Sequence, residues 1–173
     1  MSYVMKVLPF PNPFLRERAK AVENFDDELA QLVERMKVTM KSEDGLGLAA
    51  TQVGVNARVL ILSQQAFLGE DGQGEPDLVI INPEISWESD ERETASEGCL
   101  SFPGVYIQVD RPLEVRISAV DETGAPVELS GSGLGARAIL HEIDHLNGVV
   151  MIDHVSHFQR SRALKKHQKI QRT

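Results

Sequence analysis

The spacing of apolar residues predicts helices towards both ends of the chain. Residues 26–45, DDELAQLVERMKVTMKSEDG, repeat apolar side chains at intervals of three and four, start with two aspartates and end at a glycine. That pattern is typical of an amphipathic helix with acidic residues in its first turn. The same spacing predicts a helix over 134–146, with Gly148 as its stop. Residues 156–171 are expected to form a last, basic helix.

Between these helices, β-branched and alternating segments predict strands. The predicted strands are 57–63, 78–82, 105–109, 113–120 and 126–129. The first two form a hairpin-like pair. Strands that cluster in the middle of the chain, without alternating βαβ units, favour an α+β fold over a doubly wound sheet. No internal repeat or flexible linker interrupts the pattern, so we expect residues 1–173 to form one domain.

Composition narrows the class of protein. The chain is 42% hydrophobic and 25% charged, close to the averages of globular proteins. No apolar run approaches the roughly 18 to 20 residues that a membrane span needs, and the N-terminus lacks the apolar core of a signal peptide. A single cysteine, Cys99, excludes an internal disulfide and agrees with a reducing compartment. We therefore expect a cytoplasmic protein without a membrane segment.

The net charge of −8 is unevenly distributed. All 26 acidic residues precede His154, so the segment 1–153 carries −14, whereas the last 20 residues carry +6. An acidic body argues against general nucleic-acid binding or a specific DNA target. The basic tail, residues 156–173, is compatible with a contact surface and equally with a solvated helix. Its apolar residues Phe158, Leu164 and Ile170 are too widely spaced for a broad core-facing stripe, so we expect little packing from it.

The pentapeptide HEIDH, residues 141–145, carries the clearest chemistry. On a helix, His141 and His145 lie on one face about a turn apart, so they can bind one metal ion while Glu142 reaches a water molecule. A catalytic site of this kind needs a third protein ligand and an open position. Candidates for the third ligand are Cys99, Asp144, Asp153, His154 and His157. Cys99 is the most telling of these, because it lies in the constrained segment SEGCLSFPG.

A third segment, GLGLAATQ at 45–52, combines small residues with the polar Gln52, which suits a close approach of backbone to a ligand. It nearly matches a dinucleotide-binding fingerprint. That fingerprint follows a strand, whereas this segment follows a predicted helix, so a Rossmann site is excluded.

Taken in order, GLGLAATQ at 45–52, EGCLS at 97–101 and LHEIDHLNG at 140–148 resemble the three motifs of the peptide deformylases, and the resemblance covers nearly the whole chain. It implies an α+β fold with mixed or antiparallel sheets around a central HExxH helix, flanked by N-terminal and C-terminal helices. The short helical C-terminus resembles the form common in Gram-negative bacteria. The chain departs from the family at Leu140, where glutamine is usual; we expect at most a change in packing beside the site.

The resemblance implies a metal-dependent hydrolase that removes the N-formyl group from the initiator formyl-methionine of new polypeptides and releases formate. The metal ligands would be Cys99, His141 and His145, and Glu142 would move the proton. The chemistry of these ligands alone suggests zinc. The family resemblance instead implies Fe²⁺ as the working metal, with Zn²⁺, Ni²⁺ or Co²⁺ able to substitute.

Further roles follow from the same resemblance. Gln52 and the Leu100 backbone N–H would stabilise an oxyanion, and Glu97 would pair with Arg111 to support the strand that carries Cys99. The remaining residues expected at the site bind the peptide or the methionine side chain: Gly45, Leu46, Gly47, Gly98, Leu134 and Ala138.

The partners implied are N-formylmethionyl nascent peptides and, through the basic C-terminal helix, the ribosome surface near the exit tunnel. Two alternatives remain at this point. One is a metallopeptidase that uses only the HExxH motif. The other is a catalytically weakened homologue that only binds ribosomes, although the complete set of motif residues argues against such decay.

Overall fold

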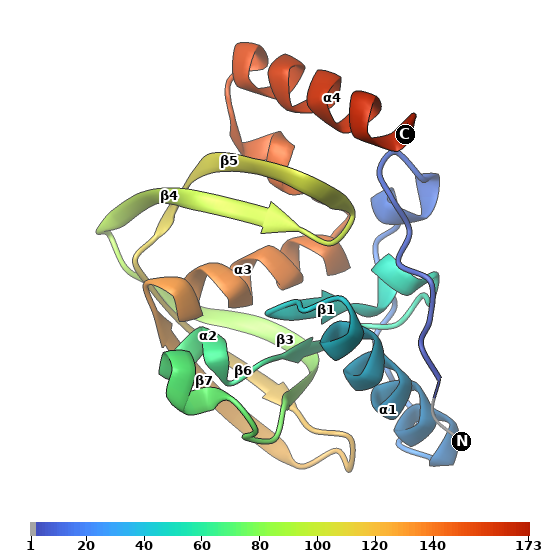
Figure 1. Ribbon diagram of the computed structural model, residues 1–173. Helices are drawn as coiled ribbons and strands as arrows, with labels where there is room; N and C mark the ends of the chain where they lie inside the picture. Colours follow the sequence, from blue (N-terminus) through green and yellow to red (C-terminus); the bar gives the residue numbers. More distant parts are fainter. Residues whose placement is uncertain (1–2) are drawn as a thin grey trace.

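The computed structural model describes residues 3–173, and its central element is helix α3 (Leu134–Leu146). This helix has the bounds that the sequence predicts. It lies between two antiparallel sheets (Figure 1), and 11 of its 13 residues are buried. A helix buried on nearly all sides can hold ionisable side chains away from water, provided that neighbouring elements supply partners.

One face of α3 packs against a five-stranded sheet. In spatial order its strands are β1 (Gly47–Ala49), β2 (Val59–Leu62), β3 (Leu78–Glu88), β6 (Glu114–Val120) and β7 (Pro126–Ser132). All neighbouring pairs are antiparallel, which confirms the α+β expectation and the predicted hairpin-like pair of β2 and β3. Apolar residues of β2, β3 and β6 form one core with Ile139, Ile143 and Leu146 of α3. Leu140 is buried in this same core.

The other side of α3 faces a two-stranded sheet of β4 (Arg92–Cys99) and β5 (Phe102–Pro112) (Figure 1). Strand β4 is absent from the elements that the sequence predicts. Its segment RETASEGC is polar, and only Glu97 within it is fully buried, so no alternation of apolar residues marks it as a strand. Its partner β5 supplies the apolar face of the pair.

Helix α1 (Asp27–Ser42) covers the opposite face of the five-stranded sheet near β1 and β2. Its N-terminus is capped by Asp26, whose side chain accepts a hydrogen bond from the Leu29 N–H at 3.0 Å. Shorter helical turns connect the larger elements: η1 (Pro13–Arg16), η2 (Ala50–Val53), α2 (Gln65–Leu68), η3 (Gly69–Gly72) and η4 (Met151–His154). No helix among residues 3–173 has both the length and the apolar character to cross a membrane.

Helix α4 (His157–Gln171) corrects the expectation of a tail that packs weakly. It lies along β5 and meets the N-terminal segment (Figure 1). Ala163 and His167 are buried, and the His167 Nε2–H donates a hydrogen bond to the Phe10 carbonyl at 2.5 Å. The buried residues are small or polar, which is why apolar spacing alone underestimated the contact. Phe158, by contrast, is 69% exposed.

Candidate metal centre and active site

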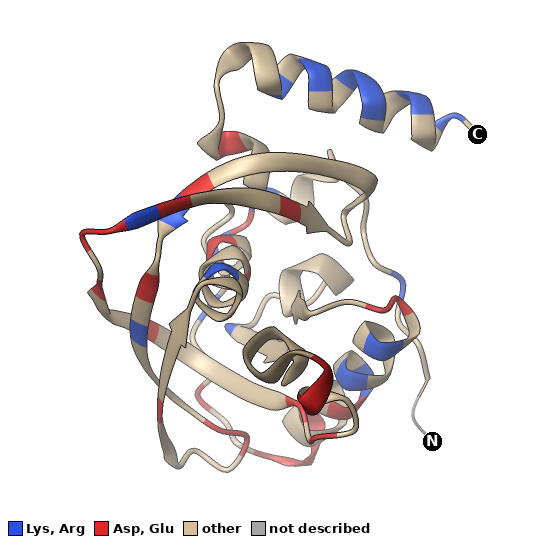
Figure 2. Ribbon diagram, turned by 60° about the vertical axis from the view of Figure 1, so that its left-hand side comes forward, with Lys and Arg blue, Asp and Glu red and all other residues tan. Residues whose placement is uncertain are grey.

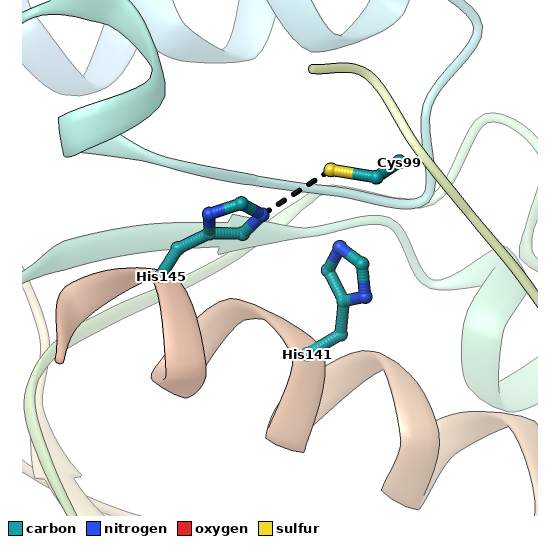
Figure 3. A group of neighbouring side chains, drawn as sticks. All are labelled: Cys99, His141 and His145. Atoms are coloured by element: carbon teal, nitrogen blue, oxygen red, sulfur yellow. Dashed lines mark hydrogen bonds between the residues drawn. The ribbon is translucent and has the colours of Figure 1, made fainter. Parts of the chain in front are cut away.

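Three side chains with metal-binding atoms converge where α3 meets the end of β4 (Figure 3). Cys99, His141 and His145 each offer one ligand atom, and these atoms lie within 4.8 Å of one another. The two imidazole centroids are 5.1 Å apart, and Cys99 Sγ lies 3.3 Å from His145 Nε2. No fourth donor joins this group within residues 3–173. One sulfur and two imidazole nitrogens suit a catalytic metal that keeps an open coordination position.

The other candidates for a third ligand are engaged elsewhere. Asp144 accepts hydrogen bonds from Arg111 at 2.9 Å and from His154 at 2.7 Å. Asp153 pairs with Arg16 and Arg160. His157 lies at the start of α4 and is exposed. Of the five candidates, only Cys99 lies beside both histidines.

Glu97 on β4 orients the first histidine. Its Oε1 accepts a hydrogen bond from His141 Nδ1 at 2.8 Å, which leaves His141 Nε2 for a ligand. Arg111 on β5 pairs with the same carboxylate, and both side chains are 4% exposed. Burial by itself would raise the pKa of Glu97, but hydrogen bonds from Arg111 and His141 hold it well below its usual range. Glu97 is therefore a fixed negative charge behind His141.

The pKa values of the two imidazoles are shifted in opposite directions. Burial lowers the pKa of both rings, but the neighbouring Cys99 and Glu97 outweigh it at His141 and raise that pKa. At His145, burial and the positive charge of His141 both lower the pKa. The His145 Nδ1 is buried, and no hydrogen-bond partner for it exists among the described residues. Because metal binding needs a thiolate and imidazole nitrogens that carry no proton, a half-buried thiol beside two buried imidazoles fits a bound metal.

Glu142 points its carboxylate towards β1. Burial is the main cause that raises its pKa to about 7, and its Oε1 finds no partner in residues 3–173. A Cβ atom on Gly47 would lie 2.6 Å from Glu142 Oε2, so the carboxylate would have to shift if residue 47 carried a side chain. A divalent ion in the cluster would lower this pKa again, because it favours the charged carboxylate.

Gln52, on η2, lies on the other side of the cysteine. Its Oε1 accepts a hydrogen bond from the Ala49 N–H at 3.0 Å, which sets the orientation of the amide. Its Nε2 then donates to Ser101 Oγ at 3.2 Å and faces Cys99 Sγ at 3.7 Å. The amide donor is thus held beside the metal-binding group by contacts at both ends.

A cavity of about 610 Å³ opens beside these groups. Nearly all the site residues expected from the sequence line it: Gly45, Leu46, Gly47, Gln52, Glu97, Gly98, Cys99, Leu100, Leu134, Ala138, His141 and Glu142. Other lining residues were not predicted, among them Tyr106 and Arg137. Tyr106 is 70% exposed, and its ring lies over Gly98. Arg137 is only 4% exposed, and no sequence signal marked it because a lone arginine in a helix is usually solvated.

The fold and site define a metal-dependent hydrolase with an HExxH helix. Comparison with known proteins then gives the family. The family model of polypeptide deformylase matches residues 4–161. A peptide deformylase of Stutzerimonas stutzeri is 47% identical over 98% of this chain and 97% of its own length.

Solved structures agree with the sequence comparison. A peptide deformylase from Legionella pneumophila superposes with a TM-score of 0.91 at 39% identity, over 98% of this chain and 96% of that one. One from Synechococcus elongatus, in complex with actinonin, gives 0.86 at 42% identity, over 95% and 86% of the two chains. The chain belongs to the polypeptide deformylase family.

Members of this family are metal-dependent enzymes that remove the N-formyl group from nascent peptides, and this chain is an enzyme of that kind. The comparisons give no support to the metallopeptidase or to a ribosome-binding protein without activity.

Proposed function

We propose that the cavity beside Cys99, His141 and His145 is where the formyl group of an N-formylmethionyl peptide is hydrolysed. The observation that carries this proposal is the convergence of one thiol and two imidazoles beside the buried carboxylate of Glu142. Water adds to the formyl carbon, the carbon–nitrogen bond breaks, and the products are formate and a free amino terminus. A divalent metal held by the three ligands would lower the pKa of a water molecule towards neutrality.

Glu142 acts as the proton carrier. Its carboxylate takes a proton from the attacking water and gives it to the departing amine. Support comes from its position, one residue after His141 on the same helix, and from its burial close to Gly47.

Gln52 and Leu100 stabilise the negative charge that develops on the formyl oxygen. The Gln52 side-chain N–H group faces Cys99, and Leu100 is the next residue along the chain from that cysteine, so its backbone N–H is close to the reacting group. Donors fixed before the reaction cost no reorganisation in the transition state.

The peptide binds as an added strand between the segment Gly45, Leu46 and Gly47 and the end of β4 at Gly98. Both segments line the cavity, and backbone groups at the edge of a strand can pair with an extended peptide. The methionine side chain contacts the α3 face that carries Leu134 and Ala138.

Ferrous iron is the working metal that we propose, with zinc, nickel or cobalt as substitutes. The proposal rests on the family resemblance, since a thiolate and two imidazoles by themselves suit zinc equally well. Protein loaded anaerobically with Fe²⁺ should turn over faster than the zinc form. Equal turnover would show that the family's preference does not extend to this chain.

The basic helix α4 is proposed to dock on the ribosome near the exit tunnel, in the cytoplasm, where formylated chains emerge. Figure 2 shows positively charged bands along α4 and no acidic ones. A helix with this charge is attracted to the phosphates of ribosomal RNA.

Formate release from formyl-Met-Ala-Ser is the direct test of the activity. We expect release that depends on added divalent metal and that a chelator abolishes. Release of methionine instead of formate would indicate a peptidase, and no release from metal-loaded protein would contradict the proposal.

A further inference from the structure

Arg137 is a buried cation that the chemistry above does not use. It lies on α3 four residues before His141, with 4% of its surface exposed, and its guanidinium points to the two-stranded sheet. A buried charge is costly unless it is paired and hydrogen-bonded, so its partners indicate its role.

The guanidinium connects the helix to both strands of that sheet. Its Nη1 donates to the carbonyl of Val109 on β5 at 2.7 Å, and its Nη2 donates to the carbonyl of Glu93 on β4 at 2.7 Å. The same Nη1 also donates to Glu97 Oε2 at 2.8 Å. One side chain of α3 therefore fixes the distance between the histidine-bearing helix and the cysteine-bearing strand.

Arg137 also completes the hydrogen bonds of Glu97. Oε1 of that carboxylate accepts from His141 Nδ1 and Arg111 Nη2, and Oε2 accepts from Arg111 Nε and Arg137 Nη1. With two donors on each oxygen, the carboxylate cannot rotate about its terminal bond without breaking a contact. Removing Arg137 leaves Oε2 with one donor, and the orientation of His141 becomes less restricted.

We propose that Arg137 is a positioning residue for the metal site, acting through Glu97 on His141 and through the β4 and β5 carbonyls on Cys99. This inference rests on the proposed metal-dependent function and adds a second arginine to the Glu97–Arg111 pair. Partners behind metal ligands typically change metal affinity or activity by about 10- to 100-fold when removed.

The test compares Arg137→Met with Arg58→Met. Arg58 is a half-buried arginine that likewise binds backbone carbonyls, those of Ala19 and of Leu146 at the end of α3, but it makes no hydrogen bond to Glu97. Both proteins are loaded with Co²⁺, and the visible absorption spectrum and the rate of cobalt loss to a chelator are measured, together with thermal unfolding.

We expect Arg137→Met to lose cobalt at least about tenfold faster than the parent protein and to shift the cobalt spectrum. Arg58→Met should lower the unfolding temperature without either change. If the two variants lose stability alike and both keep the parent's spectrum and rate of cobalt loss, Arg137 is only structural and the inference is wrong. Failure of the parent protein to bind cobalt would instead contradict the proposed function.

A second comparison covers the case in which Arg137→Met does not fold. Arg137→Lys keeps the charge but cannot make the forked contacts, so we expect it to lose cobalt faster than the parent protein. In a Glu97→Gln background, Arg137→Lys should increase the rate of cobalt loss by a smaller factor than it does alone, because part of its effect acts through that carboxylate. Additive effects in the double variant would contradict a role through Glu97.

Discussion

At the scale of single residues, closely packed neighbours restrict the position of each functional group in the site. Glu142 is buried, and its carboxylate lies close to Gly47. The Gln52 amide is held by hydrogen bonds to the Ala49 N–H and to Ser101. Groups fixed in this way need no rearrangement when charge develops, whereas small displacements are costly to catalysis. Two predictions follow at this scale.

Replacing Glu142 by alanine should leave metal binding intact and reduce turnover. The side chain is proposed to move a proton and is not a ligand, so we expect a loss of at least about 10²-fold, the lower end of general acid–base contributions. Metal content and formate release measured on the same preparation test this. Turnover within tenfold of the parent would contradict the role, and loss of the metal would mean that Glu142 is a ligand.

Replacing Gly47 by alanine should displace Glu142. The added Cβ would lie 2.6 Å from Glu142 Oε2, so the carboxylate must move by a fraction of an ångström or more. A misplacement of about 1 Å can cost about 10²-fold in rate. Gly69→Ala is a suitable control, because Gly69 has a φ of 59° but lies away from the cavity. It should lower stability by about 1 kcal/mol with unchanged kcat/KM. Equal activity of the two variants would contradict the prediction.

At the scale of elements, ionic contacts hold α3 against the two-stranded sheet, and a second group of ionic contacts lies beyond its C-terminus. Arg111, Glu97 and Arg137 join it to β4 and β5, while η4 returns the chain towards α4. Asp153 of η4 joins Arg16 of η1 to Arg160 of α4, so segments far apart in sequence meet at one carboxylate.

Asp153 should make stability depend on acidity. Partial burial raises its pKa, but hydrogen bonds from Arg16, the Val150 N–H and Arg160 prevail and hold it at about 2. The folded-state pKa lies below the ordinary aspartate pKa of about 3.9, so the contribution is present above that pH and lost as the pH falls towards 2. Allowing for solvent screening at this partly exposed site, we expect Asp153→Asn to cost about 1 kcal/mol at pH 6.

Chemical denaturation at pH 6, 5, 4 and 3 measures this contribution. The difference in free energy of unfolding between the parent and Asp153→Asn should shrink below about pH 4. Asp90→Asn, at an exposed position, serves as the control and should match the parent throughout. A difference that stays constant with pH would show that the Asp153 contacts do not depend on its charge.

At the scale of the whole molecule, charge is separated between an acidic body and the basic helix α4. This helix packs against β5 through Ala163 and His167 while its lysines face outward. The same element can therefore brace the fold on one side and present positive charge on the other (Figure 2).

Replacing Lys165, Lys166 and Lys169 together by glutamine should separate these two roles. All three side chains are exposed, so we expect normal unfolding temperature and normal release of formate from a free tripeptide. Binding to ribosomes at low salt should weaken, and the slope of log affinity against log salt should fall by about 1 for each lysine that contacts phosphate. Co-sedimentation across a salt series measures both. Unchanged binding would contradict ribosome docking through α4.

The sequence by itself predicted the three long helices and most strands among residues 3–173, and it predicted many of the residues that line the cavity. Apolar periodicity marked α3 with its observed bounds, because a buried helix repeats its contacts every three to four residues. The spacing of His141 and His145 guaranteed that they share a face. Strand β4 was not predicted because its residues are mostly polar, and it is held in the fold mainly by its antiparallel pairing with β5.

The sequence alone determined the features that local geometry sets. These are the spacing of the ligands on α3, the small residues at 45–50, and the three ordered motifs that indicate the family. Only the tertiary structure decided that Arg137 binds Glu97 and both strands of the second sheet, and that α4 packs through Ala163 and His167. The physical reason is that these contacts join residues 28 to 157 positions apart, or bury small and polar side chains, and neither leaves a periodic signal in the chain.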